Sequence, residues 1–191
     1  MLAFDLHFHV ISPFSAATKH WSQQNPPPAR VNTTLAVHKY NWLLWQKEDL
    51  ARDPSAADTV IAATKRQIDE LNQLRHNSID AFNREFAVQL ADAHVVLHPR
   101  CRMPTESFGS AVDRLSILTL RLHALRQLAT DNVEGCDAKL NKAIESYIYL
   151  MDATQALVND LYAGKAIHIT SGALKLYNDP ATNQHLRQQD T

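Results

Sequence analysis

Apolar and polar positions follow a helical period along most of the chain. Between about 33 and 163, apolar residues recur at steps of three and four, which is the spacing of one face of an α-helix. Short breaks with proline, glycine or capping residues separate four such runs. We therefore expect an all-α, single-domain bundle of about four long helices, with an irregular N-terminal arm over 1–32, a helical domain over 33–183 and a frayed tail over 184–191.

Cap residues and prolines set the expected helix boundaries. The expected helices span about 33–53, 56–90, 105–130 and 137–163. Asn32, Thr33 or Thr34 can cap the first helix, because each side chain can accept a hydrogen bond from a free backbone N–H. The third helix is apolar almost all round, so it is the best candidate for the central buried helix. Near the C-terminus, Asn178, Asp179 and Pro180 predict a turn.

The first expected helix mixes two tryptophans with ionisable and amide side chains, in the segment HKYNWLLWQKEDLAR (38–52). At steps of three and four, one stripe of this helix holds His38, Asn41, Trp45, Glu48 or Asp49, and Arg52. A stripe that is partly apolar and partly ionisable suits the wall of a polar pocket better than a solvent face. The segment therefore predicts a site between helices.

An arginine interrupts the apolar stripe of the second expected helix. Arg75 must be paired or must face a cavity, because an unpaired buried guanidinium would cost several kcal/mol. The partners that we expect for it are Glu48, Asp49, Asp69 and Asn72.

An acid and a base stand together near the start of the third expected helix. Asp113 is favoured there by the helix dipole, whereas Arg114 opposes the dipole and needs a carboxylate or an anionic ligand as its partner.

Composition narrows the classes of function. Lys and Arg number 19 against 20 Asp and Glu, so the charge does not indicate a nucleic-acid partner. Only four glycines disfavour glycine-dependent nucleotide folds, and Cys101 and Cys136 lack metal-site spacing, so we expect free thiols. No secretory signal or membrane span of about 18 apolar residues stands out, so we expect a cytoplasmic protein.

Four segments of the chain resemble the motifs of a known family. They are NWLLWQKEDLAR (41–52), KRQIDELNQLRHNSID (65–80), TESFGSAVDRLSIL (105–118) and KLYNDPATN (175–183). Together they resemble, over about 38–183, the bacterial family catalogued as domain of unknown function 4254. The resemblance implies a helical protein associated with cell-envelope polysaccharide or lipopolysaccharide gene neighbourhoods, and it implies no reaction. His76 and Asn77 stand where the family has Asn and Asp, which argues against an acid/base or metal-ligand role for Asn77.

The stripe and its expected partners define a candidate site. The candidate catalytic residues are Glu48, Asp49, Asp69 and Asp113. The candidate ligand-binding residues are His38, Asn41, Trp45, Arg52, Asn72, Arg75 and Arg114. The leading hypothesis is a site that binds, or also acts on, an anionic or polyhydroxylated small molecule such as a sugar phosphate. In it, arginines bind the phosphate or carboxylate and a carboxylate is the general base.

Two alternatives stay open from the sequence. In one, the charged residues form a buried ion-pair network, and the protein is a non-enzymatic assembly or adaptor partner, such as a homodimer. In the other, a metal-dependent enzyme uses carboxylate and histidine ligands, although no Glu-x-x-His pair occurs in an expected helix and we assign no metal ligand or cofactor. For the pair His7 and His9, a surface or packing role is favoured over metal binding. No Ser-His-Asp, Cys-His or phosphate-loop pattern indicates a covalent hydrolase or a nucleotide triphosphatase.

Overall fold

The protein is helical throughout the residues that the structure describes. The computed structural model describes residues 4–23 and 26–170, and in them the chain forms helices and one isolated bridge between Arg102 and Ala166. The elements are a π-helical segment η1 (His7–Ile11), α1 (Ser12–Trp21), α2 (Thr33–Leu50), α3 (Asp58–Asp92), α4 (Phe108–Thr130) and α5 (Cys136–Tyr162). The expected all-α, single-domain fold is confirmed. The turn expected at Asn178 to Pro180 and the tail at 184–191 lie outside the described residues.

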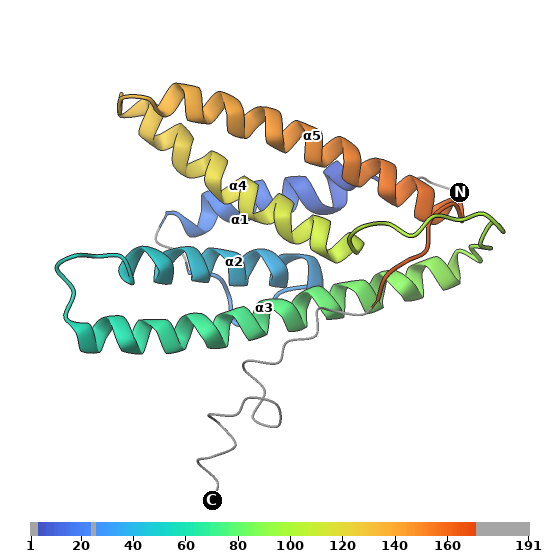
Figure 1. The fold of residues 1–191 in the computed structure, drawn as a ribbon, viewed down its shortest axis with the longest axis horizontal. Coiled ribbons are helices and arrows are strands. Elements are labelled where there is room, and N and C mark those ends of the chain that lie inside the picture. The colour runs from blue at the N-terminus through green and yellow to red at the C-terminus, as the bar shows by residue number, and fades with distance from the viewer. Residues whose placement is uncertain (1–3, 24–25, 171–191) are drawn as a thin grey trace, which may run out of the picture.

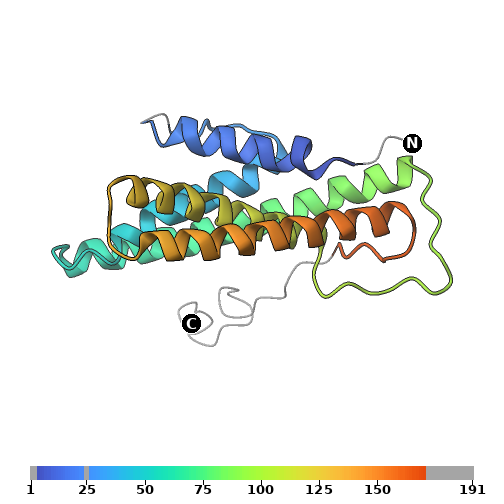
Figure 2. The same ribbon diagram turned by 90° about the horizontal axis from the view of Figure 1, so that it is seen from above.

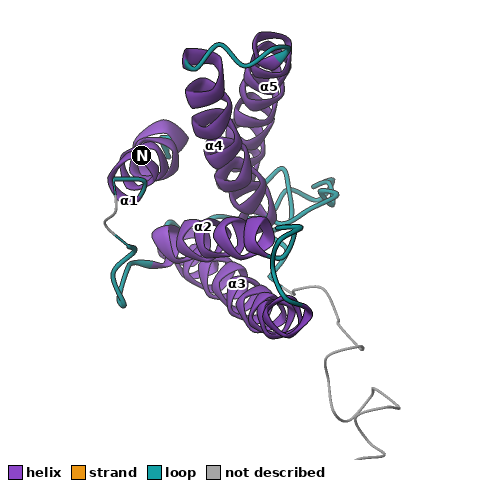
Figure 3. Ribbon diagram, turned by 90° about the vertical axis from the view of Figure 1, so that its left-hand side faces the viewer, coloured by secondary structure: helices purple, strands orange, loops and turns teal. Residues whose placement is uncertain are grey.

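Two antiparallel helix pairs and one N-terminal helix make up the part of the molecule that the structure describes. In Figure 1, α4 and α5 form the upper pair and α2 and α3 the lower pair. Seen from above, α1 runs along the side of these pairs (Figure 2), and the end-on view places α1 beside α4 (Figure 3). Since α4 packs against α1, α2, α3 and α5, it is the central helix, as its nearly all-round apolar sequence predicted.

Side-chain caps start two of the four long helices where the sequence predicted them. Asn32 accepts a hydrogen bond from the backbone N–H of Leu35 at the start of α2, and Ser107 accepts one from Ser110 at the start of α4. Each bond satisfies a donor that the first helical turn leaves free. After α5, Gly164 adopts a positive φ of 67°, which suits the residue that follows a helix end.

The expectation of an irregular N-terminal arm was wrong for residues 7–21, which form η1 and α1. Leu6, Val10, Phe14 and Trp21 are buried, and they recur at roughly helical spacing. Pro13 obscured this pattern, yet proline is tolerated in the first turn of a helix, where its missing N–H has no partner to lose. The helix is stabilised by packing on the rest of the protein.

One core joins η1, α1, α3, α4 and α5, and Leu35 of α2 packs against it. It contains Leu6, Val10, Phe14, Phe82, Phe86, Phe108, Val112, Leu115, Leu157 and Leu161. Because η1 and α1 contribute to it as fully as the long helices do, the N-terminal segment is part of the domain.

A close approach between α3 and α4 depends on a glycine. The backbone N–H of Gly109 donates to Asn83 Oδ1 (2.8 Å), and Asn83 Nδ2 donates to Ser107 Oγ (3.0 Å). Asn83 is 1% exposed, and a Cβ at position 109 would lie 2.7 Å from its Oδ1. A side chain at position 109 would therefore force Asn83 or one of the two helices to shift.

We expect Gly109→Ala to lower the free energy of unfolding by about 1–3 kcal/mol, because the added methyl group overpacks a buried contact. Urea unfolding would measure the change. In an Asn83→Ala background the clash is gone, so the same substitution should cost almost nothing. An equal cost in both backgrounds would contradict the role given to Asn83.

Candidate functional site

Most of the sequence-predicted site residues meet in one groove. It has a volume of about 320 Å³, opens between α2 and α3, and has one residue of α4 in its lining. The lining residues are Asn41, Leu44, Trp45, Glu48, Asp49, Arg52, Asn72, Arg75 and Ile117. We call it the α2–α3 groove. The stripe predicted from Asn41 to Arg52 forms its α2 wall, and Asn72 with Arg75 forms its α3 wall.

Arg75 carries a partly buried positive charge with few partners. Its side chain is 22% exposed, and its Nε lies 4.0 Å from Asp113 Oδ1. Its Nη1 donates a long hydrogen bond of 3.5 Å to Asn41 Oδ1, and its buried Nε has no hydrogen-bond partner among the described residues. A guanidinium has five N–H donors, so most of this hydrogen-bonding capacity is unused within the part of the chain that the structure describes.

The partners expected for Arg75 were wrong. Its contacts are Asn41 on α2 and Asp113 on α4, whereas the sequence predicted Glu48, Asp49, Asp69 and Asn72. Helical spacing shows which residues share a face, and it does not show which residues of a second helix lie opposite.

Asp113 lies beneath the groove and is held by a hydrogen bond. Asn41 Nδ2 donates to Asp113 Oδ1 at 2.8 Å, and the Asp113 side chain is 13% exposed. This carboxylate therefore positions Asn41 and balances Arg75, and it does not itself line the groove.

His38 lies in the core, where its two ring nitrogens have different partners. Thr18 Oγ1 donates to the carbonyl of Phe14 (2.9 Å), so His38 Nε2 must donate to Thr18 (2.8 Å). In the neutral ring Nδ1 is then the acceptor, and Ser116 Oγ donates to it (2.9 Å). Ser116 in turn accepts from Asn41 Nδ2 (3.0 Å). Each group thus donates to the next, in the order Asn41, Ser116, His38, Thr18 and the carbonyl of Phe14.

Burial keeps His38 neutral. The residue is 0% exposed, and its ring stacks with Phe14 (4.6 Å between centroids) and Trp21 (5.3 Å). Desolvation lowers the pKa of His38 to about 3. His38 therefore does not line the groove; through Ser116 it fixes the orientation of Asn41. Ser116 is also 0% exposed, so the Ser116–His38 pair has no surface at which a substrate could meet a nucleophile.

Two other candidate residues lie away from the groove. Asp69 is exposed and does not line it, because a rotation of about 100° per residue from buried Ile68 turns Asp69 to solvent. Arg114 pairs with Glu106, with Arg114 Nη1 2.7 Å from Glu106 Oε1, and the Arg114 side chain is 58% exposed. The carboxylate partner expected for Arg114 is thus confirmed, and its expected place in the shared pocket is wrong.

The outer end of the groove holds an exposed ion-pair cluster. Arg52 Nη1 lies 2.6 Å from Glu48 Oε2, and Lys65 Nζ lies 3.8 Å from the same oxygen. Of the candidate bases, only Glu48 and Asp49 line the groove, and Glu48 already has these two cations as partners.

Thr18 and Ser116 were not among the residues predicted from the sequence. Ser116 is a polar residue on the buried face of α4, and Thr18 lies four residues after Phe14 on the buried face of α1. A polar side chain on a buried face needs a hydrogen-bond partner, and this was the available signal.

The remaining sequence predictions concern metals, thiols and membranes. No group of three or more His, Cys, Asp or Glu residues within 4–23 and 26–170 is arranged to hold a metal ion. His7 and His9 lie on η1, where residues two apart point to different sides, and His7 is exposed. Cys101 and Cys136 are free, as expected. No helix in the described residues is both long enough and apolar enough to span a bilayer.

We expect the stability of the protein to rise with pH because of His38. The pKa of His38 is 6.5 in the unfolded chain and about 3 in the folded chain. Between these values, protonation of His38 therefore favours unfolding. The free energy of unfolding should therefore fall by up to about 1.4 kcal/mol per pH unit as the pH drops below 6.5. Urea unfolding at about pH 7, 6 and 5 measures this slope.

Two variants separate His38 from other titrating groups. His38→Asn should be less stable at pH 7, because Thr18 and Ser116 lose their partner, and should show a shallower pH slope. His7→Asn, at an exposed position, should keep the slope of the unmodified protein. An unchanged slope in His38→Asn would show that His38 is not the group responsible.

The chain was also compared with known proteins. Residues 32–169 match the model of the family described as "Protein of unknown function (DUF4254)". No curated protein and no solved structure matches the chain. The match runs from the N-cap of α2 past the end of α5, so it includes the groove; the fourth motif, at 175–183, lies beyond it and outside the described residues. Because this match covers well over half of the chain, the chain belongs to the DUF4254 family.

Proposed function

We propose that the α2–α3 groove binds a small polyhydroxylated molecule that carries an anionic group, such as a sugar phosphate. The observation that carries this proposal is the state of Arg75. It is a partly buried cation at an open groove, with one long hydrogen bond and an Nε that has no partner among the described residues. A phosphate or carboxylate would satisfy the vacant N–H groups with charge-assisted hydrogen bonds.

The rest of the lining supports a sugar as the neutral part of the ligand. Trp45 contributes an aromatic surface, which can pack against the C–H face of a sugar ring. Asn72 and the carboxylates of Glu48 and Asp49 offer acceptors for hydroxyl groups. The volume of about 320 Å³ lies at the lower end of ligand sites, which suits a molecule of monosaccharide size. A sugar phosphate also agrees with the polysaccharide gene neighbourhoods that the family resemblance implies.

A structural role is the second candidate, and the inner residues favour it. Asn41, Asp113, Ser116 and His38 satisfy one another through hydrogen bonds of 2.8 to 3.0 Å. Arg75 is not satisfied by its neighbours in this way, because the groove stays open beside it. We therefore propose that the inner network has a structural role: it positions Asn41 and, through Asn41, the guanidinium of Arg75.

We expect glucose 1-phosphate to bind to the full chain and to change the fluorescence of Trp45, which lines the groove. Arg75→Gln should weaken this binding by about tenfold or more, since a hydrogen bond to a charged group contributes roughly 1.5–3 kcal/mol. The matched control is Arg66→Gln, at an exposed position on the same helix, which should bind as the unmodified protein does. Circular dichroism should show unchanged helicity in both.

A second variant tests the sugar part and does not disturb the core. Asp49 is exposed, so Asp49→Ala should fold normally, weaken glucose 1-phosphate and leave the weaker binding of inorganic phosphate unchanged. Two results would overturn the proposal: no binding of either compound, or equal binding by Arg75→Gln and Arg66→Gln. Unfolding of Arg75→Gln, with no effect of Asp49→Ala, would favour the structural role.

A further inference from the structure

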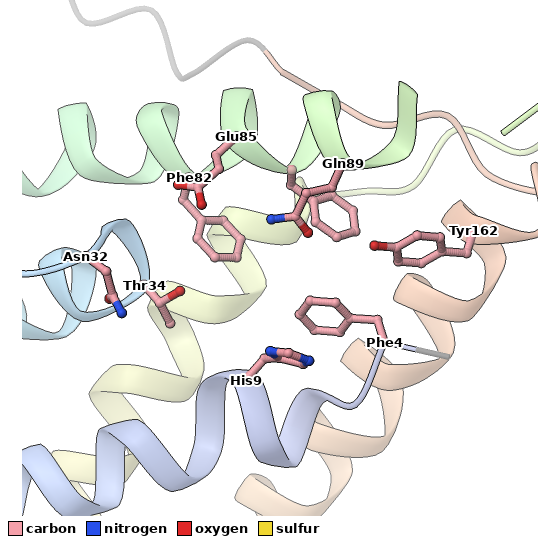
Figure 4. Close-up of a pocket in the computed structure, with 9 residues that line it drawn as sticks. Phe4, His9, Asn32, Thr34, Phe82, Glu85, Gln89 and Tyr162 are labelled. Carbon is pink, nitrogen blue, oxygen red and sulfur yellow. The ribbon is translucent and has the colours of Figure 1, made fainter. Parts of the chain in front are cut away.

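A second cleft lies away from the α2–α3 groove and shares no lining residue with it. Its volume is about 410 Å³, and it lies between η1, the start of α2, the C-terminal half of α3 and the end of α5. Figure 4 shows Phe4, Phe82 and Tyr162 around it, with His9 on one side and Gln89 on the other. We call it the Phe4 cleft.

Aromatic rings dominate one side of the Phe4 cleft. The ring of Phe4 lies 5.8 Å from Phe86 and 6.4 Å from Tyr162, between centroids, and it stacks on His9 at 4.7 Å. Phe86 is 2% exposed and fixes this group against the core. The face of an aromatic ring carries partial negative charge and attracts cations.

The lining of the Phe4 cleft also contains a negatively charged side chain. Glu85 is its carboxylate, and His9 is the one basic side chain that lines the cleft, since the lining contains no lysine or arginine. Thr33 Oγ1 donates to Glu85 Oε2 and so orients the carboxylate. Burial raises the pKa of Tyr162, so its hydroxyl stays neutral. An anionic ligand would therefore find no fixed Lys or Arg cation here, whereas a cation would find a carboxylate and ring faces.

Two polar side chains point into the Phe4 cleft. The amide of Gln89 and the hydroxyl of Tyr162 are directed toward its centre in Figure 4, and neither forms a side-chain hydrogen bond within the described part of the chain. Tyr162 is half-buried, and half-buried polar groups usually have partners, whereas Gln89 is exposed. Because both point toward the centre of the cleft, their donors and acceptors are available to a ligand there.

We infer that the Phe4 cleft binds a quaternary ammonium group of the choline type, a site separate from the proposed sugar-phosphate groove. A primary ammonium needs about three hydrogen-bond acceptors, whereas a quaternary ammonium needs none and is stabilised by ring faces and one nearby carboxylate. Phe4, Phe82 and Tyr162 provide the rings, and Glu85 provides the carboxylate. The hydroxyl of a choline-type molecule can bond to Gln89 or Tyr162.

Nuclear magnetic resonance with the full chain tests this inference. The probe is choline, and its neutral isostere 3,3-dimethylbutan-1-ol has the same shape without the charge. Choline should bind at least about tenfold tighter than the isostere, because the cation–π and carboxylate interactions need the charge. Its methyl protons should shift upfield on binding, since they lie over aromatic faces.

Variants separate the Phe4 cleft from general effects of charge. Glu85→Gln is at an exposed position, so it should fold normally and weaken choline binding about tenfold. Glu70→Gln, at an exposed position on the same helix, and Arg75→Gln, in the α2–α3 groove, should both leave choline binding unchanged. Phe4→Leu should weaken choline and leave the isostere unaffected.

The outcomes of this experiment are decisive in either direction. Equal affinity for choline and its isostere, no choline binding, or unchanged binding in Glu85→Gln would each overturn the inference. Binding of free choline without capture on phosphatidylcholine vesicles would assign a soluble ligand, and capture on the vesicles that Glu85→Gln abolishes would assign a lipid headgroup; each supports a quaternary ammonium site.

Discussion

The burial of a neutral imidazole between three helices is the constraint on which the rest of the structure depends. His38 on α2 donates to Thr18 on α1 and accepts from Ser116 on α4, so one side chain fixes the relative position of three elements. Each of these hydrogen bonds is buried, and a buried polar group without its partner costs about 1–3 kcal/mol. The rings of Phe14 and Trp21 exclude water from the imidazole and keep it neutral.

The α2–α3 groove derives from that core. Ser116 and Asp113 hold the amide of Asn41 from two sides, and the amide oxygen left over faces Arg75. The guanidinium is therefore positioned by groups that stay out of the groove, which leaves most of its own donors unused within the described residues. The inner residues of this network satisfy one another, while the groove beside Arg75 stays open, so the network combines the ligand-binding hypothesis with the structural alternative. The inner residues are structural, and the outer ones are proposed to bind a ligand.

Local signals were enough to predict most of the fold. The caps Asn32 and Ser107 and the helical spacing of apolar residues predicted α2 to α5, because these features act within one or two turns. The N-terminal helix was missed, since histidines and Pro13 hide its buried face. Its stability comes from packing on α4 and α2, which a local pattern does not contain. The same limit applies to the site, where Thr18 and Ser116 became visible only as partners of His38.

The sequence by itself determined which side chains share a helix face. Asn41, Trp45 and Arg52 line one groove because 3.6 residues make a turn, whatever the helix packs against. Only the tertiary structure decided which faces meet. It placed Arg75 against Asn41 and Asp113, turned Asp69 to solvent and paired Arg114 with Glu106. The physical reason is that partners across helices depend on how the helices cross and rotate, and this is set by the packing of the whole core.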